Sequence, residues 1–385
     1  MYAGVMEYWP KRVSFGTGSV RLLPSLMMEF GARRALVVCG RTVADGEMLT
    51  RVTAALGERC VEVYDGVTAH TPVEKVQEAA YRLEAIEADA IISIGGGSAI
   101  DAGKGIALTR AAGDGLRSFA IDFGARSMAR PALPDPDICH IAIPTTAGSA
   151  SDVMPTAAIR DPATGTKLLF WDDRLVPNAT VLDPEMAVFA GPELTASAGM
   201  TAMARAIECL YSADRQPLST GLAVHAIRLL RRALPRVIEV PSDLSARADC
   251  QMACLMSGTA AINSMVSVVH AIGHIIGGRY VLQHGISHAM LLAPAMRRLL
   301  PTIGADQEFV HEALGVAPGA SAADAAGRLA AMVAELPLPR RLREVGIHRH
   351  ELSDIAAATM SDYMMANLPE PMTEPDVLAL LDEAF

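Results

Sequence analysis

Aromatic side chains and basic charge are both scarce in this sequence. Phe, Trp and Tyr make up 4% of its 385 residues, and the excess of acidic over basic residues gives a formal net charge of −10. Nucleic-acid binding needs a basic surface and aromatic side chains on which bases stack. The composition therefore argues against a nucleic-acid partner, and we expect a small-molecule substrate.

Long apolar runs and paired cysteines are also missing. The N-terminal stretch MYAGVMEYWPKRVSFG has no continuous apolar segment, and no later run reaches the roughly 18 residues of a membrane span. The six cysteines, at positions 39, 60, 139, 209, 250 and 254, form no CxxC pair, which is typical of reduced core thiols. We expect a cytoplasmic protein with no membrane partner.

The pattern of apolar residues changes at about residue 191. Before it, short β-branched runs such as ALVVCG at 35–40 alternate with helical patterns, which predicts parallel strands joined by right-handed crossovers. After it, long segments rich in Ala, Leu and Met carry helical periodicity. We predict an α/β dinucleotide-binding domain over residues 1–186, followed by an all-α domain over residues 187–385.

A glycine-rich turn carries the clearest chemistry in the first half. In AIISIGGGSAIDAGK, a buried strand leads into Gly95, Gly96 and Gly97, and a helix is expected to begin between Ser98 and Asp101. Glycines let backbone N–H groups approach a diphosphate, and a helix N-terminus adds partial positive charge. The alternative is that the turn serves only tight packing of strand against helix.

A second loop, IPTTAGSASDV at 143–153, also follows a predicted strand and is dense in small hydroxyl residues. By itself it could be an ordinary polar connection. Taken in order with FGTGSV, YDGVTAHTPVEKV, GGGSAIDAGK, KLLFWDDRLVPNATVLDPE, GMTAMARAIE and the histidine-rich stretch at 268–288, it resembles the iron-containing (group III) alcohol dehydrogenase family.

That resemblance implies a dehydroquinate synthase-like fold, a homodimer, and NADH or NADPH as cofactor. In the family, the GGGS segment binds the pyrophosphate and the PTT loop lines the nicotinamide end. The cofactor contacts that it implies are Gly96, Gly97, Ser98, Asp101, Thr145, Thr146 and Ser149.

The residues after the first buried strand bear on the choice of coenzyme. Members that prefer NAD often carry an aspartate there, whereas this chain has Gly40 followed by Arg41. Without a carboxylate nothing repels a 2′-phosphate, and an arginine can pair with one. We predict that NADPH is accepted, the alternative being that Arg41 is only a solvated charge.

The metal site of the family is incomplete in this sequence. Metal-dependent members present a D-x3-H pair on one helix and two later histidines. Here the later pair is intact as His270 and His284, but Thr201 replaces the aspartate and Arg205 replaces the first histidine. A guanidinium stays protonated and repels a dication. We expect no metal at this degenerate site, unless His270, His274, His284 and His288 form another ligand set.

Arg205 could supply the positive charge that the metal ion gives in the family, towards a developing alkoxide or a substrate carboxylate. His270, His274 or His284 could then donate the proton that completes the alcohol. The alternative for each histidine is a hydrogen-bonded core residue. His288 is a weaker candidate, and His140 and His225 are interpreted as structural or surface residues.

Several segments resemble the maleylacetate reductase branch of the family, among them GVTAHTPVE, the spacing from His284 to His288, and the C-terminal NLPEPMTEPDVLALLDEAF. The leading hypothesis is an NAD(P)H-dependent reductase of a small, anionic carbonyl compound. The alternatives are a metal-dependent alcohol dehydrogenase with displaced ligands, a degenerate member that binds nucleotide without turnover, and non-redox chemistry that uses a tightly held NAD.

Overall fold

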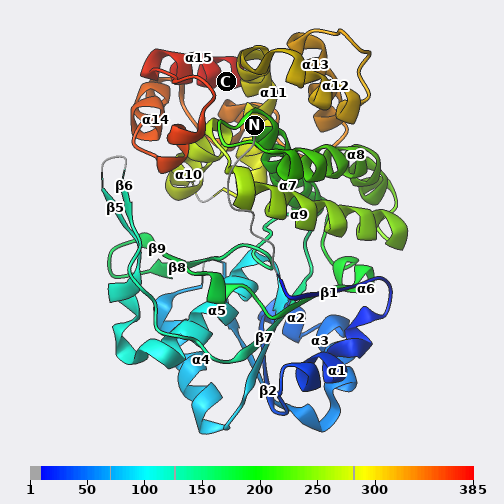
Figure 1. The fold of residues 1–385 in the computed structure, drawn as a ribbon, viewed down its shortest axis with the longest axis vertical. Coiled ribbons are helices and arrows are strands. Elements are labelled where there is room, and N and C mark those ends of the chain that lie inside the picture. Colours follow the sequence, from blue (N-terminus) through cyan, green and yellow to red (C-terminus); the bar gives the residue numbers. More distant parts are fainter. Residues whose placement is uncertain (1–9, 70, 125–126, 281) are drawn as a thin grey trace. The chain divides into compact units, whose positions relative to one another are not determined.

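Six parallel strands form the sheet of the first half, in the order β1-β10-β7-β4-β2-β3 (Figure 1). The computed structural model describes residues 10–69, 71–124, 127–280 and 282–385. The six strands are β1 (Arg12–Phe15), β2 (Ala35–Gly40), β3 (Cys60–Val67), β4 (Ala90–Gly95), β7 (Cys139–Pro144) and β10 (Ala179–Leu182). Two short pairs flank them: β5 (Asp122–Gly124) with β6 (Ser127–Ala129), and β8 (Thr156–Asp161) with β9 (Thr166–Trp171).

Helices cover both faces of this sheet because its central strands are apolar on both sides. Leu36 and Val38 of β2 pack in one core with α4 and α5, whereas Val37 and Cys39 face a second core with α1 and α3. Such continuous apolar runs are typical of buried parallel strands. The helices of this unit are α1 (Leu23–Glu29), α2 (Arg41–Ala44), α3 (Glu47–Leu56), α4 (Val73–Ala85), α5 (Gly97–Ala112) and α6 (Pro184–Ala187).

The strand order changes direction next to β2. The chain continues from β2 to its neighbour β3, then crosses to the other side of β2 to form β4. Ligands of open α/β sheets bind at the carboxyl ends of strands where the order reverses in this way. At this edge lie Gly40, which ends β2, and Gly95, which ends β4.

The second unit is helical, which confirms the predicted order of an α/β domain followed by an all-α domain. Its helices are α7 (Pro192–Tyr211), α8 (Pro217–Glu239), α9 (Leu244–Ser264), α10 (Val268–Tyr280), α11 (His284–Leu299), α12 (Glu308–Leu314), α13 (Ala322–Ala334), α14 (Leu352–Thr359) and α15 (Glu374–Ala384). No single helix of the described residues is long and apolar enough to cross a membrane, although α9 and α10, bent by 107° against each other, meet those criteria as a pair.

The two compact units divide between Phe189 and Ala190. The sequence analysis places the division between residues 186 and 187, which is within α6. Met186 of that helix is fully buried in the core beneath α1 and α3. The side chain of Met186 therefore ties α6 to the first unit, and the helical unit begins after it.

Lys104 is a fully buried lysine in the middle of α5. Its Nζ donates hydrogen bonds of 2.7 Å to the carbonyls of Met154 and Thr156. Burial lowers the pKa of Lys104 to about 8, an effect that the nearby carboxylates of Asp101 and Asp152 oppose. Lys104 thus fastens the end of the loop that follows β7 to the helix that follows β4.

The Lys104→Met variant should be less stable than the wild type by about 2 kcal/mol, because two buried carbonyls lose their donor. The difference should grow as pH rises from about 8 towards 10.5. In that window the unfolded lysine still binds its proton and the folded one does not, so the wild type gains stability that the variant lacks. Urea unfolding of both proteins at pH 7.5 and 10 checks this, and a difference that shrinks with pH would contradict it.

Candidate active site

The glycine turn after β4 brings two loops together. Gly95 has a φ of +146°, and a Cβ built on it would lie 2.8 Å from the Cβ of Ala99. A Cβ on Gly97 would lie 2.8 Å from the Cβ of Ser149. Helix α5 begins at Gly97, and no side chain caps its N-terminus. Only glycines allow the turn and the close approach of the second loop, and an anion fits the uncapped helix end.

The residues predicted to contact the cofactor gather around this turn. The backbone N–H of Thr145 donates to the carbonyl of Gly95 at 2.9 Å, and the side chain of Thr146 lies 3.4 Å from the position of a Cβ on Gly96. Ser98 lies in the first turn of α5. The cofactor roles of these residues remain predictions. The fold places the residues at the carboxyl ends of β4 and β7.

Asp101 has a different set of partners from the one expected. Its Oδ2 accepts the backbone N–H of Ala158 in β8 at 3.3 Å. Burial raises the pKa of Asp101, against the effect of the ammonium of Lys104. The carboxylate therefore links α5 to β8, and a contact with the cofactor is still only a prediction for this residue.

The position after β2 that is predicted to bear on the choice of coenzyme lies near a carboxylate that the sequence analysis missed. Gly40 pairs in register with Gly66 and Val67 of β3, so the preceding residue, Asp65, comes near. Arg41 Nη2 lies 3.8 Å from Asp65 Oδ2, with the side chain of Arg41 79% exposed. Strand β2 ends without an acidic residue, but the neighbouring strand β3 supplies Asp65, which lies beside Arg41.

On the helical side, Thr201 and Arg205 lie one turn apart on α7. The hydroxyl of Thr201 donates to the carbonyl of Ser197 at 3.2 Å. Arg205 is only 4% exposed, and its Nη1 donates to the hydroxyl of Ser257 on α9 at 3.2 Å. Helix α11 packs closely against this part of α7, because a Cβ on Gly285 would fall 1.7 Å from the Ser197 carbonyl oxygen.

His270 contacts a buried carboxylate on α7. Its Nδ1 is paired with Glu208 Oε2, and Glu208 is fully buried. Burial lowers the pKa of His270, the carboxylate of Glu208 opposes this, and the charge of Arg205 adds to the lowering. Nε2 of His270 is buried without a partner among the described residues.

His288, the weaker candidate of the sequence analysis, lies against His270. The two ring centroids are 4.2 Å apart, and His288 is fully buried with neither ring nitrogen partnered among the described residues. Burial lowers the pKa of His288 well below its usual value, and the neighbouring histidines and Arg205 lower it further. Gly273 makes room for this ring, since a Cβ there would lie 2.8 Å from His288 Nε2.

His274 and His284 continue the cluster towards solvent. The ring of His284 lies 5.9 Å from that of His274 and 6.0 Å from that of His288. His274 Nδ1 is 2.9 Å from Asp362 Oδ2, and the His274 side chain is 33% exposed. The other carboxylate oxygen of Asp362 accepts the N–H of Met364, which fixes the acid in place.

The side chains at the four former ligand positions do not fit a divalent cation. They offer two imidazoles and one hydroxyl, and the fourth position holds a buried guanidinium that repels a dication and has no lone pair to donate. Within the part of the chain that the structure describes, no three His, Cys, Asp or Glu side chains are grouped so as to hold a metal ion. The alternative set of four histidines forms no such group in this conformation.

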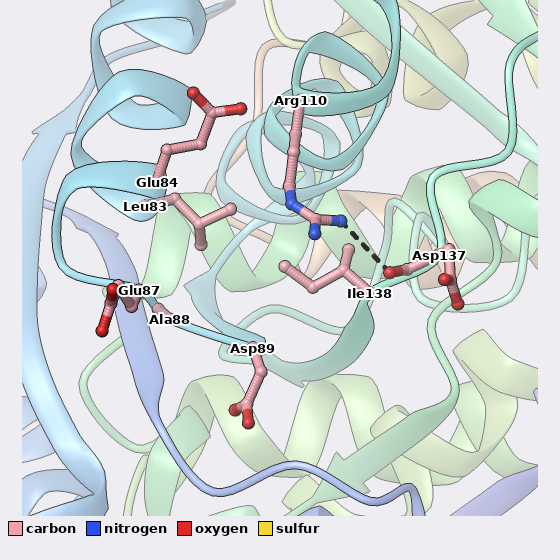
Figure 2. A pocket seen from close by; sticks show the side chains of 8 residues that line it. All are labelled: Leu83, Glu84, Glu87, Ala88, Asp89, Arg110, Asp137 and Ile138. Carbon is pink, nitrogen blue, oxygen red and sulfur yellow. Dashed lines mark hydrogen bonds between the residues drawn. The ribbon is translucent and has the colours of Figure 1, made fainter.

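His140 and His225, which the sequence analysis interprets as structural or surface residues, lie outside the cluster, as does a surface pocket. His140 is buried and its Nε2 is 2.8 Å from the hydroxyl of Ser93, while His225 is exposed on α8. Figure 2 shows a pocket of about 410 Å³ in which Arg110 donates to the carbonyl of Asp137. It lies at the amino ends of β4 and β7, the edge of the sheet opposite to the glycine turn, so we do not include it in the site.

Sequence reasoning missed Glu208, Asp362 and Asp65. Glu208 could have been predicted from the sequence, because positions 201, 205 and 208 share one face of a helix. Asp362 and Asp65 could not have been predicted, since only the folded chain brings Asp362 beside His274 and Asp65 beside Arg41.

Two family models match the chain: "Iron-containing alcohol dehydrogenase" over residues 10–184 and "Fe-containing alcohol dehydrogenase family, C-terminal" over residues 195–385. Maleylacetate reductase 2 of Cupriavidus pinatubonensis is 32% identical, over 99% of this chain and 96% of its own length. The 1,3-propanediol dehydrogenase of Klebsiella pneumoniae is 29% identical, over 96% of each chain. The crystal structure of a 1,3-propanediol oxidoreductase is similar with a TM-score of 0.90 and 27% identity, covering 99% of this chain and 100% of that one.

Proposed function

Because the chain belongs to the iron-containing alcohol dehydrogenase family, whose members are oxidoreductases that use NAD(P)H, we propose that it reduces a small anionic carbonyl compound without a metal ion. The observation that carries this proposal is the buried guanidinium of Arg205 beside the histidines of α10 and α11. The relatives named maleylacetate reductase support a keto acid as the substrate class.

The buried charge of Arg205 suits an anion. A guanidinium binds carboxylate through two parallel hydrogen bonds, and such pairs gain strength where water is excluded. Arg205 also donates to the hydroxyl of Ser257. A carboxylate of the substrate would pair with this charge and hold the adjacent carbonyl in a fixed orientation.

The proton that completes the alcohol comes, in this proposal, from His274. Bound NAD(P)H supplies the hydride that the carbonyl carbon receives. Asp362 holds Nδ1 of His274, which leaves Nε2 to face the substrate. The partial exposure of the ring lets it regain a proton from solvent after each turnover. The roles of His284 and His288 are to shape the site between His270 and His274.

The coenzyme proposal rests on Arg41 and Asp65 together. Asp65 alone would repel a 2′-phosphate, but Arg41 lies close enough to offset its charge and is exposed enough to turn towards a phosphate. We therefore propose that NADPH is accepted because Arg41 is present, and that the same acid would favour NADH if Arg41 were removed.

Replacing Arg205 with Lys should lower kcat/KM for a keto acid by about 10- to 100-fold, because an ammonium cannot reproduce the bidentate pair. A neutral aldehyde of similar size should be affected much less. The matched control is Arg247→Lys, which changes another arginine that is 4% exposed in the same unit and donates to Thr195. Equal losses for the acidic and the neutral substrate, or the same selective loss in the Arg247 variant, would argue against an anion at Arg205.

Arg41→Ala should raise the KM for NADPH about tenfold more than that for NADH, since one charged contact to a phosphate is worth about 1.4 kcal/mol. Asp65→Asn should change the ratio in the opposite direction by removing the repulsion. Steady-state kinetics with both coenzymes measure the two ratios. A wild type that strongly prefers NADH, with no response to Arg41→Ala, would disprove this assignment.

A further inference from the structure

Glu208 is a buried carboxylate that accepts hydrogen bonds from groups on and beside the first turn of α10. Its Oε1 accepts the backbone N–H groups of Ser267 at 3.2 Å and Val269 at 2.9 Å, and the hydroxyl of Ser267 at 3.0 Å. Its Oε2 contacts Nδ1 of His270. Glu208 thus comes from α7 and caps the N-terminus of α10, which begins at Val268.

The partners of Oε1 determine the direction of the bond at Oε2. Backbone N–H groups can only donate, and a helix N-terminus favours negative charge, so Glu208 is held as a carboxylate. A carboxylate can only accept a hydrogen bond, so Nδ1 of His270 must carry a proton. In the neutral imidazole, Nε2 then keeps its lone pair and is an acceptor.

We propose that Glu208 is a positioning residue that fixes His270 as the Nδ1–H tautomer and presents Nε2 to the substrate as a hydrogen-bond acceptor. This inference rests on the proposed function and refines it. His270 does not donate the proton that completes the alcohol, and instead accepts a hydrogen bond from a hydroxyl of the substrate or product. Nε2 has no partner among the described residues, as such an acceptor requires.

The contrast with His274 supports this division of roles. Both rings place Nδ1 against a carboxylate, but the side chain of His270 is 8% exposed and that of His274 is 33% exposed. A donor must be reprotonated from solvent in each turnover, which suits His274. A hydrogen-bond acceptor needs a constant tautomer instead. In His270 the tautomer is fixed by the contact of Nδ1 with the fully buried Glu208.

Glu208→Gln tests the inference because it should reverse the tautomer while keeping the cap. The amide oxygen has to remain with the donors of Ser267 and Val269, so the NH₂ group faces Nδ1 of His270. An NH₂ group can only donate, so Nδ1 must give up its proton and Nε2 must take one. The control is Asp183→Asn, which alters another buried acid that caps a helix: Asp183 accepts the N–H groups of Val20 and Glu185.

The readout is ¹⁵N NMR of the histidine rings in the full-length protein without substrate, with the His270 signals assigned from their loss in His270→Gln. We expect Nδ1–H in the wild type and in Asp183→Asn, and Nε2–H in Glu208→Gln. The kcat of Glu208→Gln should fall about 10- to 100-fold with coenzyme affinity unchanged. Ser267→Ala, which removes one donor from Oε1 only, should keep the wild-type tautomer.

An Nε2–H tautomer or an imidazolium at His270 in the wild type would overturn the inference, even if Glu208→Gln failed to fold. A folded Glu208→Gln protein with an unchanged tautomer would also overturn it. Because the NMR measurement needs no turnover, a protein that shows the expected tautomers but reduces no keto acid would count against the proposed function and not against the role of Glu208.

Discussion

The site that we propose in the helical unit depends on one buried positive charge. Arg205 lies on α7 and is only 4% exposed; burial lowers the pKa values of His270 and His288, and the charge of Arg205 adds to that lowering. Placing a guanidinium in a low-dielectric surrounding is expensive unless an anion or a hydrogen-bond network compensates it. In the function that we propose, the charge that opposes a metal ion at this position also binds an anion. Loss of the metal ligand and gain of a binding group would then be one change.

Carboxylates orient two of the histidines around that charge. Glu208 fixes His270 from inside the helical core, and Asp362 fixes His274 near the surface. Each acid contacts a different ring at Nδ1, so in both histidines Nε2 is the nitrogen that is left for the substrate. The side chain of His270 is more deeply buried than that of His274. In the proposed reaction, Arg205 binds the acid group of the substrate, and the two imidazoles orient the carbonyl and deliver the proton.

The fold and the glycine-rich turn after β4 were predictable because their signals are local. Two features are visible in the sequence itself: the β-branched run before Gly95 to Gly97, and the change of periodicity near residue 191. The structure confirms the architecture that they indicate. The partners of the site residues were not predictable, since they depend on register and tertiary packing. Asp65 reaches Arg41 only because β3 pairs with β2, and Asp101 turned towards β8 because that strand packs on α5. His288 was underrated because nothing local shows that Gly273 leaves space for its ring.

The central claim, that the charge of Arg205 takes the place of a metal ion, is tested most directly by one paired measurement on the same sample. Metal content is determined by plasma mass spectrometry after dialysis without chelator, and NADPH oxidation is followed with maleylacetate as substrate. We predict far less than one iron, zinc or nickel ion per chain, with turnover that a chelator leaves unchanged. One tightly held ion per chain, with turnover lost on its removal, would contradict it.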